Sequence, residues 1–157
     1  MKLRIAGVEK DSVVDGAGIR YVIFAQGCPH RCPGCHNPQT HDPSGGELVA
    51  LDTLLADICR QKHIKGVTFS GGEPFLQAQA LASLGRELKH KGYDIVTYTG
   101  YLFEDLLDLS RSRPDILALL KVTDWLIDGP YILEQKTFNL PYRGSANQRV
   151  IDLRQFE

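Results

Sequence analysis

The chain has 157 residues, a formal net charge of −1, 43% hydrophobic residues and 4 cysteines. This length fits one domain with a sizeable core, so we expect residues 1–157 to form a single domain. The balanced charge gives no broad attraction to nucleic acid or to a membrane, and we expect neither as a partner. The N-terminus lacks the apolar run of a signal peptide, and no stretch approaches the about 20 apolar residues of a spanning helix. We therefore expect a cytoplasmic protein.

Strand-like and helix-like segments alternate along the chain. Apolar runs predict strands at 20–25, 66–70, 93–98, 125–128 and 148–153, with 3–5 as the candidate for a sixth. Helical spacing predicts helices at 51–62 and 75–91 and a helix pair within 102–121. Such alternation favours parallel strands with right-handed crossovers. We expect an α/β fold, a partial, open barrel of five or six mainly parallel strands, because a closed barrel of this type has eight.

Local signals set the ends of two predicted helices. Gly92 is placed to end the helix at 75–91, and Pro114 suits the first turn of a helix. Polar or glycine-rich segments directly follow four of the predicted strands. They are the segment 28–35, called the cysteine segment below, and Gly71-Gly72-Glu73-Pro74, Thr99-Gly100 and Asp128-Gly129-Pro130. Because the carboxyl ends of parallel strands meet on one rim, we expect these segments to converge on one site.

The cysteine segment is the most informative motif. Cys28, Cys32 and Cys35 form the spacing C-x-x-x-C-x-x-C. In a reducing compartment, clustered cysteines are typical of metal sites or catalytic thiols rather than of disulfides. Three thiolates can hold three corners of a four-iron, four-sulfur cluster and leave the fourth iron open to a small molecule. The spacing therefore indicates a reactive cluster rather than a closed one.

Two other interpretations of the cysteines remain open at this point. A zinc site could take a fourth ligand from His30, His36 or His41, although structural zinc sites more often show two cysteine pairs. A simple electron carrier would normally use four cysteines for each cluster. The remaining cysteine, Cys59, continues the apolar stripe of the helix at 51–62, so we expect it in the core rather than at the cluster.

The segment Ser70-Gly71-Gly72-Glu73-Pro74 is a second candidate site. Two glycines at the end of a strand let the backbone approach a ligand closely, because neither carries a Cβ. The Glu73 carboxylate beside them suits a bound ammonium group. Alone this signal is weak, since paired glycines between a strand and a helix are usually just a turn.

Together these motifs resemble the radical S-adenosylmethionine superfamily. Within it, Val14-Asp15-Gly16-Ala17-Gly18-Ile19-Arg20, Gln26-Gly27-Cys28 and Cys32-Pro33-Gly34-Cys35-His36-Asn37 resemble the activases of glycyl radical enzymes. Two further motifs resemble the branch that activates anaerobic ribonucleoside-triphosphate reductase: Asp128-Gly129-Pro130-Tyr131 and Arg143-Gly144-Ser145-Ala146-Asn147-Gln148-Arg149. The similarity runs over nearly the whole chain. The stretch 36–67 contains only Cys59 and thus lacks the cysteine-rich insertion of several other activases.

The resemblance implies a mechanism. Cys28, Cys32 and Cys35 would hold a [4Fe–4S] cluster, and S-adenosylmethionine would bind the remaining iron. One electron, from a flavodoxin or ferredoxin, would cleave it to methionine and a 5′-deoxyadenosyl radical. That radical would remove a hydrogen atom from the Cα of a glycine in the reductase. The protein would supply orientation and exclude side reactions, because the cofactor carries the hard chemistry.

The resemblance also suggests roles for individual residues. Gly71, Gly72 and Glu73 would bind the methionine amino group, and the backbone around Gly34, Cys35 and His36 would pack against the adenine. Thr99 and Asp128 are candidates for the ribose or the carboxylate, and Asp128 is equally suited to capping a turn. Asp15 and Arg20 could pair to hold the cysteine segment. Candidates for a substrate carboxylate or the reductase surface are the basic residues Lys136, Arg143 and Arg149.

No side chain is assigned a catalytic role. The alternatives left open are an activase of another glycyl radical enzyme, a radical enzyme acting on a small molecule, and a metal module without activity. The sequence does not identify the electron donor, the oligomeric state or the stoichiometry with the reductase.

Overall fold

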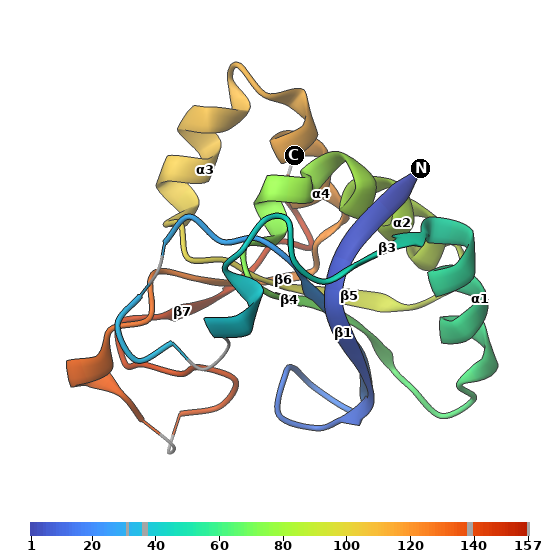
Figure 1. Ribbon diagram of the computed structural model, residues 1–157, viewed down its shortest axis with the longest axis horizontal. Coiled ribbons are helices and arrows are strands. Elements are labelled where there is room, and N and C mark those ends of the chain that lie inside the picture. The colour runs from blue at the N-terminus through green and yellow to red at the C-terminus, as the bar shows by residue number, and fades with distance from the viewer. Residues whose placement is uncertain (31, 36–37, 138–139, 157) are drawn as a thin grey trace.

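The computed structural model describes residues 1–30, 32–35, 38–137 and 140–156, and the described part forms one mixed seven-stranded sheet (Figure 1). The strand order is β3-β1-β2-β4-β5-β6-β7. The strands span Lys2–Ser12 (β1), Arg20–Ala25 (β2), Glu47–Ala50 (β3), Gly66–Gly71 (β4), Asp94–Tyr98 (β5), Trp125–Asp128 (β6) and Arg149–Asp152 (β7). Different strands occupy the two edges, so the sheet is open.

The four central strands are parallel, whereas the outer ones are not. β2, β4, β5 and β6 pair in parallel, as the strand-helix alternation predicts. β1 and β3 on one side and β7 on the other are joined by antiparallel pairing. The predicted open partial barrel is confirmed, with one strand more than expected. The additional strand is β3, which has only four residues and directly precedes a helix.

The helices lie in the intervals that the periodicity predicts. They span Leu51–Arg60 (α1), Ala78–His90 (α2), Phe103–Ser110 (α3) and Pro114–Val122 (α4). Pro114 opens α4, and Gly92 follows α2 with φ +92°, the left-handed conformation that ends many helices. The predicted helix at 75–91 begins with a separate 3₁₀ turn, η2 (Pro74–Gln77), before α2.

Within the described residues, no helix is both long and apolar enough to cross a membrane.

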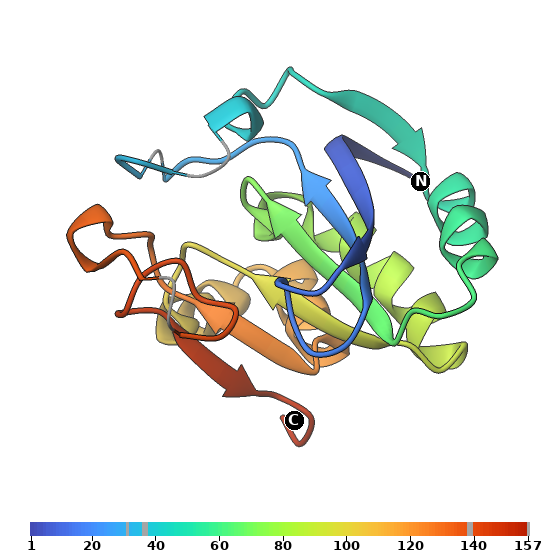
Figure 2. The same cartoon turned by 90° about the horizontal axis from the view of Figure 1, so that it is seen from below.

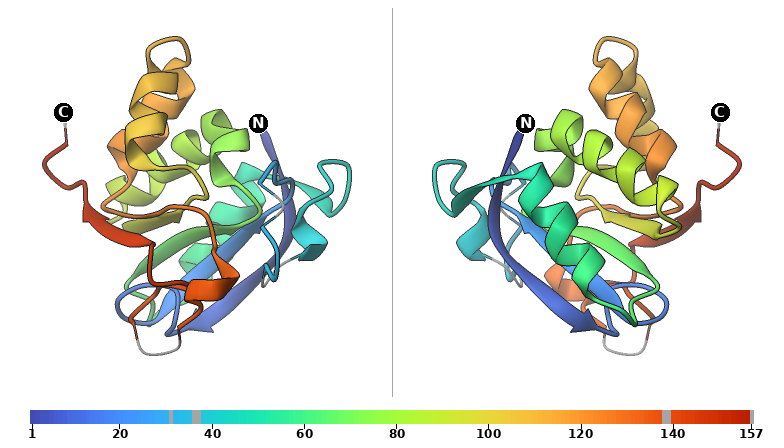
Figure 3. Two further views of the ribbon diagram at one scale, coloured as in Figure 1. Left: turned by 90° about the vertical axis from the view of Figure 1, so that its left-hand side faces the viewer. Right: turned by 90° about the vertical axis from the view of Figure 1, so that its right-hand side faces the viewer.

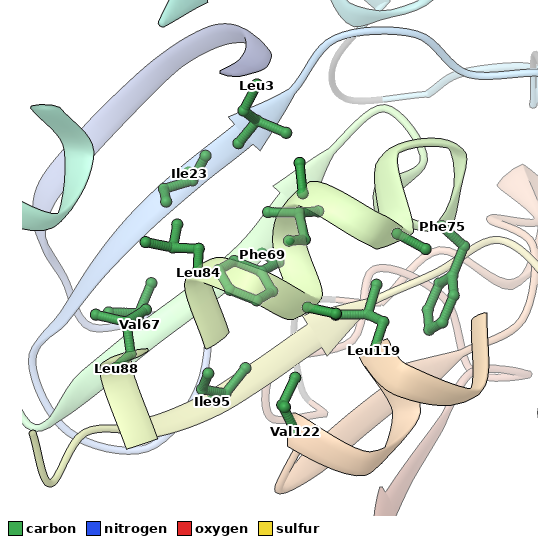
Figure 4. Close-up of a cluster of buried hydrophobic side chains, with 14 of the residues drawn as sticks. Leu3, Ile23, Val67, Phe69, Phe75, Leu84, Leu88, Ile95, Leu119 and Val122 are labelled. Carbon is green, nitrogen blue, oxygen red and sulfur yellow. The ribbon is translucent and has the colours of Figure 1, made fainter. Parts of the chain in front are cut away.

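The helices gather on one side of the sheet and bury its apolar side chains (Figure 3). Val67 and Phe69 of β4, Ile95 of β5 and Leu84 of α2 are at most 2% exposed and belong to this core (Figure 4). Successive side chains of a strand point to opposite faces. Thr68 and Ser70 therefore face away from the helices, and this second face carries the site described below.

Cys59 corrects one expectation. It is exposed on α1 rather than part of the core. The buried residues of α1 are Leu54 and Ile58. Each residue turns a helix by about 100°, so the position after Ile58 has already left the narrow buried stripe.

Candidate active site

One cavity lies beyond the carboxyl ends of the parallel strands, with a volume of about 600 Å³. Figure 2 shows the described parts of the cysteine segment and of the connection between β6 and β7 (129–137 and 140–148) reaching this end of the sheet from its two sides. The described residues that line the cavity include Cys28, Cys32, Cys35, Ser70, Gly71, Gly72, Thr99, Gly100 and Gly129. The structure thus brings together segments that follow four different strands.

Backbone and side-chain hydrogen bonds hold the start of the cysteine segment. The Gly27 and Cys28 amides donate to Thr40 O and His41 O over 2.5 and 3.2 Å. The Gln26 side-chain amide donates to Gln39 O and Asp42 O over 3.0 and 2.8 Å. Gln26 therefore ties the segments before and after the cysteines together.

Gly71 and Gly72 are required by close packing against β2 and the residues after it. A Cβ on Gly71 would lie 2.4 Å from Ala25 N, and one on Gly72 would lie 2.2 Å from Gly27 O. The Gly72 and Glu73 amides donate to Ala25 O and Gly27 O over 2.9 and 2.7 Å. The paired glycines therefore do more than form a turn, because their backbone lies directly beside the start of the cysteine segment and lines the cavity.

Glu73 directly follows the two glycines that line the cavity and is completely buried. Its Oε1 accepts from His30 Nε2 over 2.5 Å and from Gly100 N over 2.8 Å. Its Oε2 accepts from Thr99 Oγ1 over 2.8 Å and from Phe75 N over 3.2 Å. Glu73 is not among the cavity-lining residues, so its side chain connects the walls of the site and does not face the space inside.

Asp128 is also completely buried, and it too lies outside the cavity lining. Its carboxylate accepts from Arg149 Nε over 3.0 Å and Phe103 N over 2.8 Å, and it forms an ion pair with the Arg149 guanidinium at 2.5 Å. The hydrogen bonds to Asp128 raise the pKa of Arg149 above its ordinary value, with a smaller contribution from Glu104. This carboxylate connects β6, β7 and the start of α3.

Of the other predicted site residues, some line the cavity and others lie behind its lining. Thr99 lines the cavity and also donates to Glu73, whereas Gly34 lies outside the lining and faces Leu133. His36 is outside the described residues. A ligand role for Gly34, Glu73, Asp128 and Thr99 stays a prediction.

The predicted pair between Asp15 and Arg20 is not the one that forms. Arg20 is fully buried, makes an ion pair with Asp94 at 2.6 Å and donates to Thr68 Oγ1 over 2.7 Å. Asp15 instead accepts from Ser12 Oγ over 2.6 Å. Arg20 meets Asp94 because it begins β2 and Asp94 begins β5, and β4 alone separates these parallel strands.

The sequence analysis missed several residues of the wall. Tyr98, the last residue of β5, lines the cavity and donates to Tyr142 O over 2.7 Å. Burial raises its pKa above the ordinary value for a tyrosine. Its place at the carboxyl end of a parallel strand is the signal that could have identified it. Tyr131, Tyr142 and Arg143 also line the cavity, and they come from a long connection with little sequence periodicity.

The basic residues near the C-terminus have separate environments. Arg143 lines the cavity and is the one lysine or arginine among its described lining residues. Its Nε is buried and has no hydrogen-bond partner among the described residues. Arg149 is bound instead to Asp128 and, over 2.8 Å, to Glu104. Lys136 is outside the described lining.

Known proteins with similar sequences place this site in a family. The family model of the 4Fe-4S single cluster domain matches residues 14–151. The anaerobic ribonucleoside-triphosphate reductase-activating protein of Enterobacteria phage T4 is 36% identical over 143 residues, which cover 87% of this chain and 86% of that protein. The protein of the same name from Vibrio cholerae is 37% identical over 145 residues, with 87% and 89% covered. The chain belongs to this activase family.

Two further likenesses extend the comparison. Pyruvate formate-lyase 1-activating enzyme of Escherichia coli is 33% identical to this activase-family chain over 160 residues, covering 98% of the chain but only 61% of that enzyme. The crystal structure of QueE from Escherichia coli superposes with a TM-score of 0.51 and 22% identity, over 64% of this chain and 53% of that one. The second likeness shows the fold alone, and it agrees with an open partial barrel.

The residues present fit the cluster and the S-adenosylmethionine that the radical activase family uses. All three motif cysteines line one cavity and are half-buried. Leaving residues 31, 36, 37, 138, 139 and 157 aside, no three His, Cys, Asp or Glu side chains are grouped to hold a single metal ion. A zinc ion needs all its ligands within about 2.3 Å of one point, whereas each cysteine of a cubane binds a different iron. Three cysteines around one cavity, in a chain that matches the 4Fe-4S single cluster family model, fit three corners of a cubane.

Proposed function

We propose that this protein activates anaerobic ribonucleoside-triphosphate reductase by generating a glycyl radical on it. The observation that carries the proposal is that three cysteines and the Gly71-Gly72 backbone line one cavity in a chain of the activase family. Cys28, Cys32 and Cys35 would hold the cluster, which would supply the electron for cleaving S-adenosylmethionine, and a glycine Cα of the reductase would supply the hydrogen atom. A flavodoxin or ferredoxin is the expected electron donor.

The chain's own residues would hold the reactants in place. We assign the methionine amino group to the cavity-lining backbone of Gly71 and Gly72, which the buried Glu73 directly follows. Thr99, the Gly34–Cys35 turn and His36 remain the candidates for the nucleoside, and Asp128 is the weakest candidate because its carboxylate is occupied by Arg149. Arg143 presents a cation toward the cavity, which suits a carboxylate of the ligand or of the partner.

The organisation of the chain supports two smaller proposals. One continuous sheet contains all seven strands of the described residues, which supports a single radical S-adenosylmethionine domain over residues 1–157. We also propose a cytoplasmic location, because iron-sulfur sites with open coordination and free thiols suit a reducing compartment.

The test begins with anaerobic reconstitution by iron and sulfide. The reduced protein should convert S-adenosylmethionine into methionine and 5′-deoxyadenosine, and electron paramagnetic resonance should show a glycyl radical after the reductase is added. Absence of cleavage by a protein that holds its full complement of iron would contradict the proposal and favour a metal module without activity.

A second candidate function is activation of another glycyl radical enzyme. Pyruvate formate-lyase-activating enzyme of Clostridium pasteurianum is 35% identical over 127 residues, which cover 77% of this chain and 53% of that enzyme. Presenting the reductase and pyruvate formate-lyase in parallel reactions separates the two. A radical on the lyase alone would select the second candidate, and cleavage with a radical on neither would favour a small-molecule substrate.

A further inference from the structure

His30 lies midway between the first two cysteines of the motif, and residues at the ends of β4 and β5 surround its ring. Its Nε2 donates to Glu73 Oε1 over 2.5 Å, since an ionised carboxylate can only accept. The ring lies at 78° to the Tyr101 ring, with 4.6 Å between centroids. A Cβ on Gly100 would lie 2.4 Å from the imidazole Cδ2. Glu73, Tyr101 and Gly100 therefore contact the ring on three sides, and we call these three residues the His30 seat.

The Glu73 carboxylate, which accepts from His30, already receives as many hydrogen bonds as a carboxylate usually does. An ionised carboxylate offers about four lone-pair sites, and Glu73 receives donors from His30, Gly100, Thr99 and Phe75. A ligand ammonium group could reach the carboxylate only by displacing one of these donors. The carboxylate therefore acts as a junction between the cysteine segment and the strand ends.

The junction completes a chain of contacts that joins the two halves of the site. At the start of the cysteine segment, Glu73 N donates to Gly27 O over 2.7 Å. His30 adds a side-chain contact to the same glutamate three residues later. Glu73 is thus bonded through its backbone to Gly27, directly before the first cysteine, and through its side chain to His30. It also directly follows the glycines that line the cavity.

We propose that His30 is a positioning residue that sets the distance between the three cysteines and the Gly71-Gly72 backbone. Through Glu73 and Gly100, it holds the middle of the cysteine segment against the surface where S-adenosylmethionine binds. The proposal rests on the proposed function, because it assigns the cluster and the ligand to these two surfaces. It predicts that disturbing the His30 seat weakens ligand binding even when the cluster is retained.

The experiment compares three variants with one control in reconstituted protein. His30→Phe keeps a ring against Tyr101 but removes the donor, His30→Gln restores a side-chain N–H, and Gly100→Ala pushes the unchanged ring from its seat. His63→Phe is the matched control, because His63 pairs with Asp11 over 2.7 Å but is 57% exposed. The measurements are bound iron, the dissociation constant of S-adenosylmethionine, and the paramagnetic resonance spectrum of the reduced cluster with and without that ligand.

The expected result is a graded loss of binding. His30→Phe and Gly100→Ala should weaken S-adenosylmethionine binding about tenfold, the usual scale for residues that orient metal ligands, and should alter the spectral change that the ligand causes. His30→Gln should recover most of the affinity, and His63→Phe should match the unmodified protein. Wild-type affinity and spectra in His30→Phe would overturn the proposal.

Two further outcomes are also decisive. If His30→Phe takes up no iron, the affinities of His30→Gln and Gly100→Ala for S-adenosylmethionine decide the proposal. Binding by His30→Gln that is near normal, with weakened binding by Gly100→Ala, supports the proposal, and a Gly100→Ala protein that binds normally overturns it. Failure of the proposed function is distinct, since the unmodified protein would then neither bind nor cleave S-adenosylmethionine.

Discussion

Glu73, two residues after β4, and Asp128, the last residue of β6, are both completely buried at the carboxyl ends of parallel strands, but their partners differ. Glu73 accepts hydrogen bonds from the His30 ring of the cysteine segment and from Thr99 and Gly100, directly after β5. Asp128 binds a guanidinium from β7 and the first amide of α3. An acidic residue beside glycine at a strand end therefore has two uses here. One assembles the walls of the site, and the other closes the edge of the sheet.

The glycines beside these carboxylates differ in the same way. Gly72 is crowded by Gly27 O, whereas a Cβ on Gly129 would find its nearest neighbour at 3.6 Å. At Gly129 only the backbone conformation, with φ +100°, requires glycine. The β4 end requires close approach between two segments, whereas the β6 end, which also lines the cavity through Gly129, requires only a turn of the backbone.

The largest expected difference comes from removing each carboxylate. Glu73→Ala removes the acceptor of Phe75 N, Thr99 Oγ1 and Gly100 N. Each unsatisfied buried group costs about 1–3 kcal/mol, so we expect at least about 3 kcal/mol of lost stability. Asp128→Ala leaves Phe103 N without its acceptor, while Arg149 keeps Glu104, so about 1–3 kcal/mol is expected. Urea unfolding measures both. Equal losses of stability in the two variants would contradict the different roles assigned to Glu73 and Asp128.

The glycines should follow the same order. Gly72→Ala forces Gly27 and the cysteine segment to move, so we expect reduced iron uptake on reconstitution as well as reduced stability. Gly129→Ala should cost about 1–2 kcal/mol for its left-handed conformation and leave iron uptake unchanged. Iron content after desalting separates the effects. Normal iron uptake by Gly72→Ala would count against close approach as the function of the paired glycines.

Arg149→Lys should have a smaller effect. The ammonium group cannot reproduce the two contacts that the guanidinium makes with Asp128, but Arg149 is 45% exposed and solvent screens the pair. We expect a loss of about 1 kcal/mol and unchanged affinity for S-adenosylmethionine. A clear loss of affinity would instead assign the Asp128–Arg149 pair to the binding site.

The smallest effect is expected for Glu104→Gln. Glu104 is 61% exposed, and its hydrogen bonds to Arg149 lower its pKa below the ordinary value. A lowered pKa contributes stability above the pKa of the unfolded chain, and that contribution is lost as pH falls through the folded pKa. Thermal melting should show no measurable change at pH 7, because exposed pairs contribute little. A clear decrease would mean that the Asp128–Arg149 pair depends on Glu104.

The sequence was most informative where spacing and backbone conformation decide the structure. The parallel strands, the cysteine segment and the paired glycines were predicted, because apolar runs, cysteine spacing and missing Cβ atoms all act locally. The partners of buried charges were not. Asp15 and Arg20 are close in sequence, but Arg20 reaches Asp94 because strand order, not sequence distance, brings them together.

The wall formed by the described residues 129–137 and 140–148 also shows that sequence patterns do not predict long-range contacts. Tyr142 has φ +64°, and its carbonyl accepts from Tyr98, whereas Ser145, Asn147 and Gln148 bond to one another and to nearby backbone. No periodicity marks such a segment, because long-range hydrogen bonds and not an apolar stripe determine its path. The motif Arg143–Arg149 indicated a family, but its structural role required the three-dimensional structure.

Transfer of a labelled hydrogen atom tests the central claim most directly. The reductase would be prepared with glycine deuterated at Cα and incubated anaerobically with the reconstituted, reduced protein and S-adenosylmethionine. We predict that the 5′-deoxyadenosine formed gains one deuterium by mass spectrometry, in step with the glycyl radical seen by paramagnetic resonance. Unlabelled 5′-deoxyadenosine formed alongside a normal rate of S-adenosylmethionine cleavage would contradict the account, because the radical would then not be taking its hydrogen from the reductase.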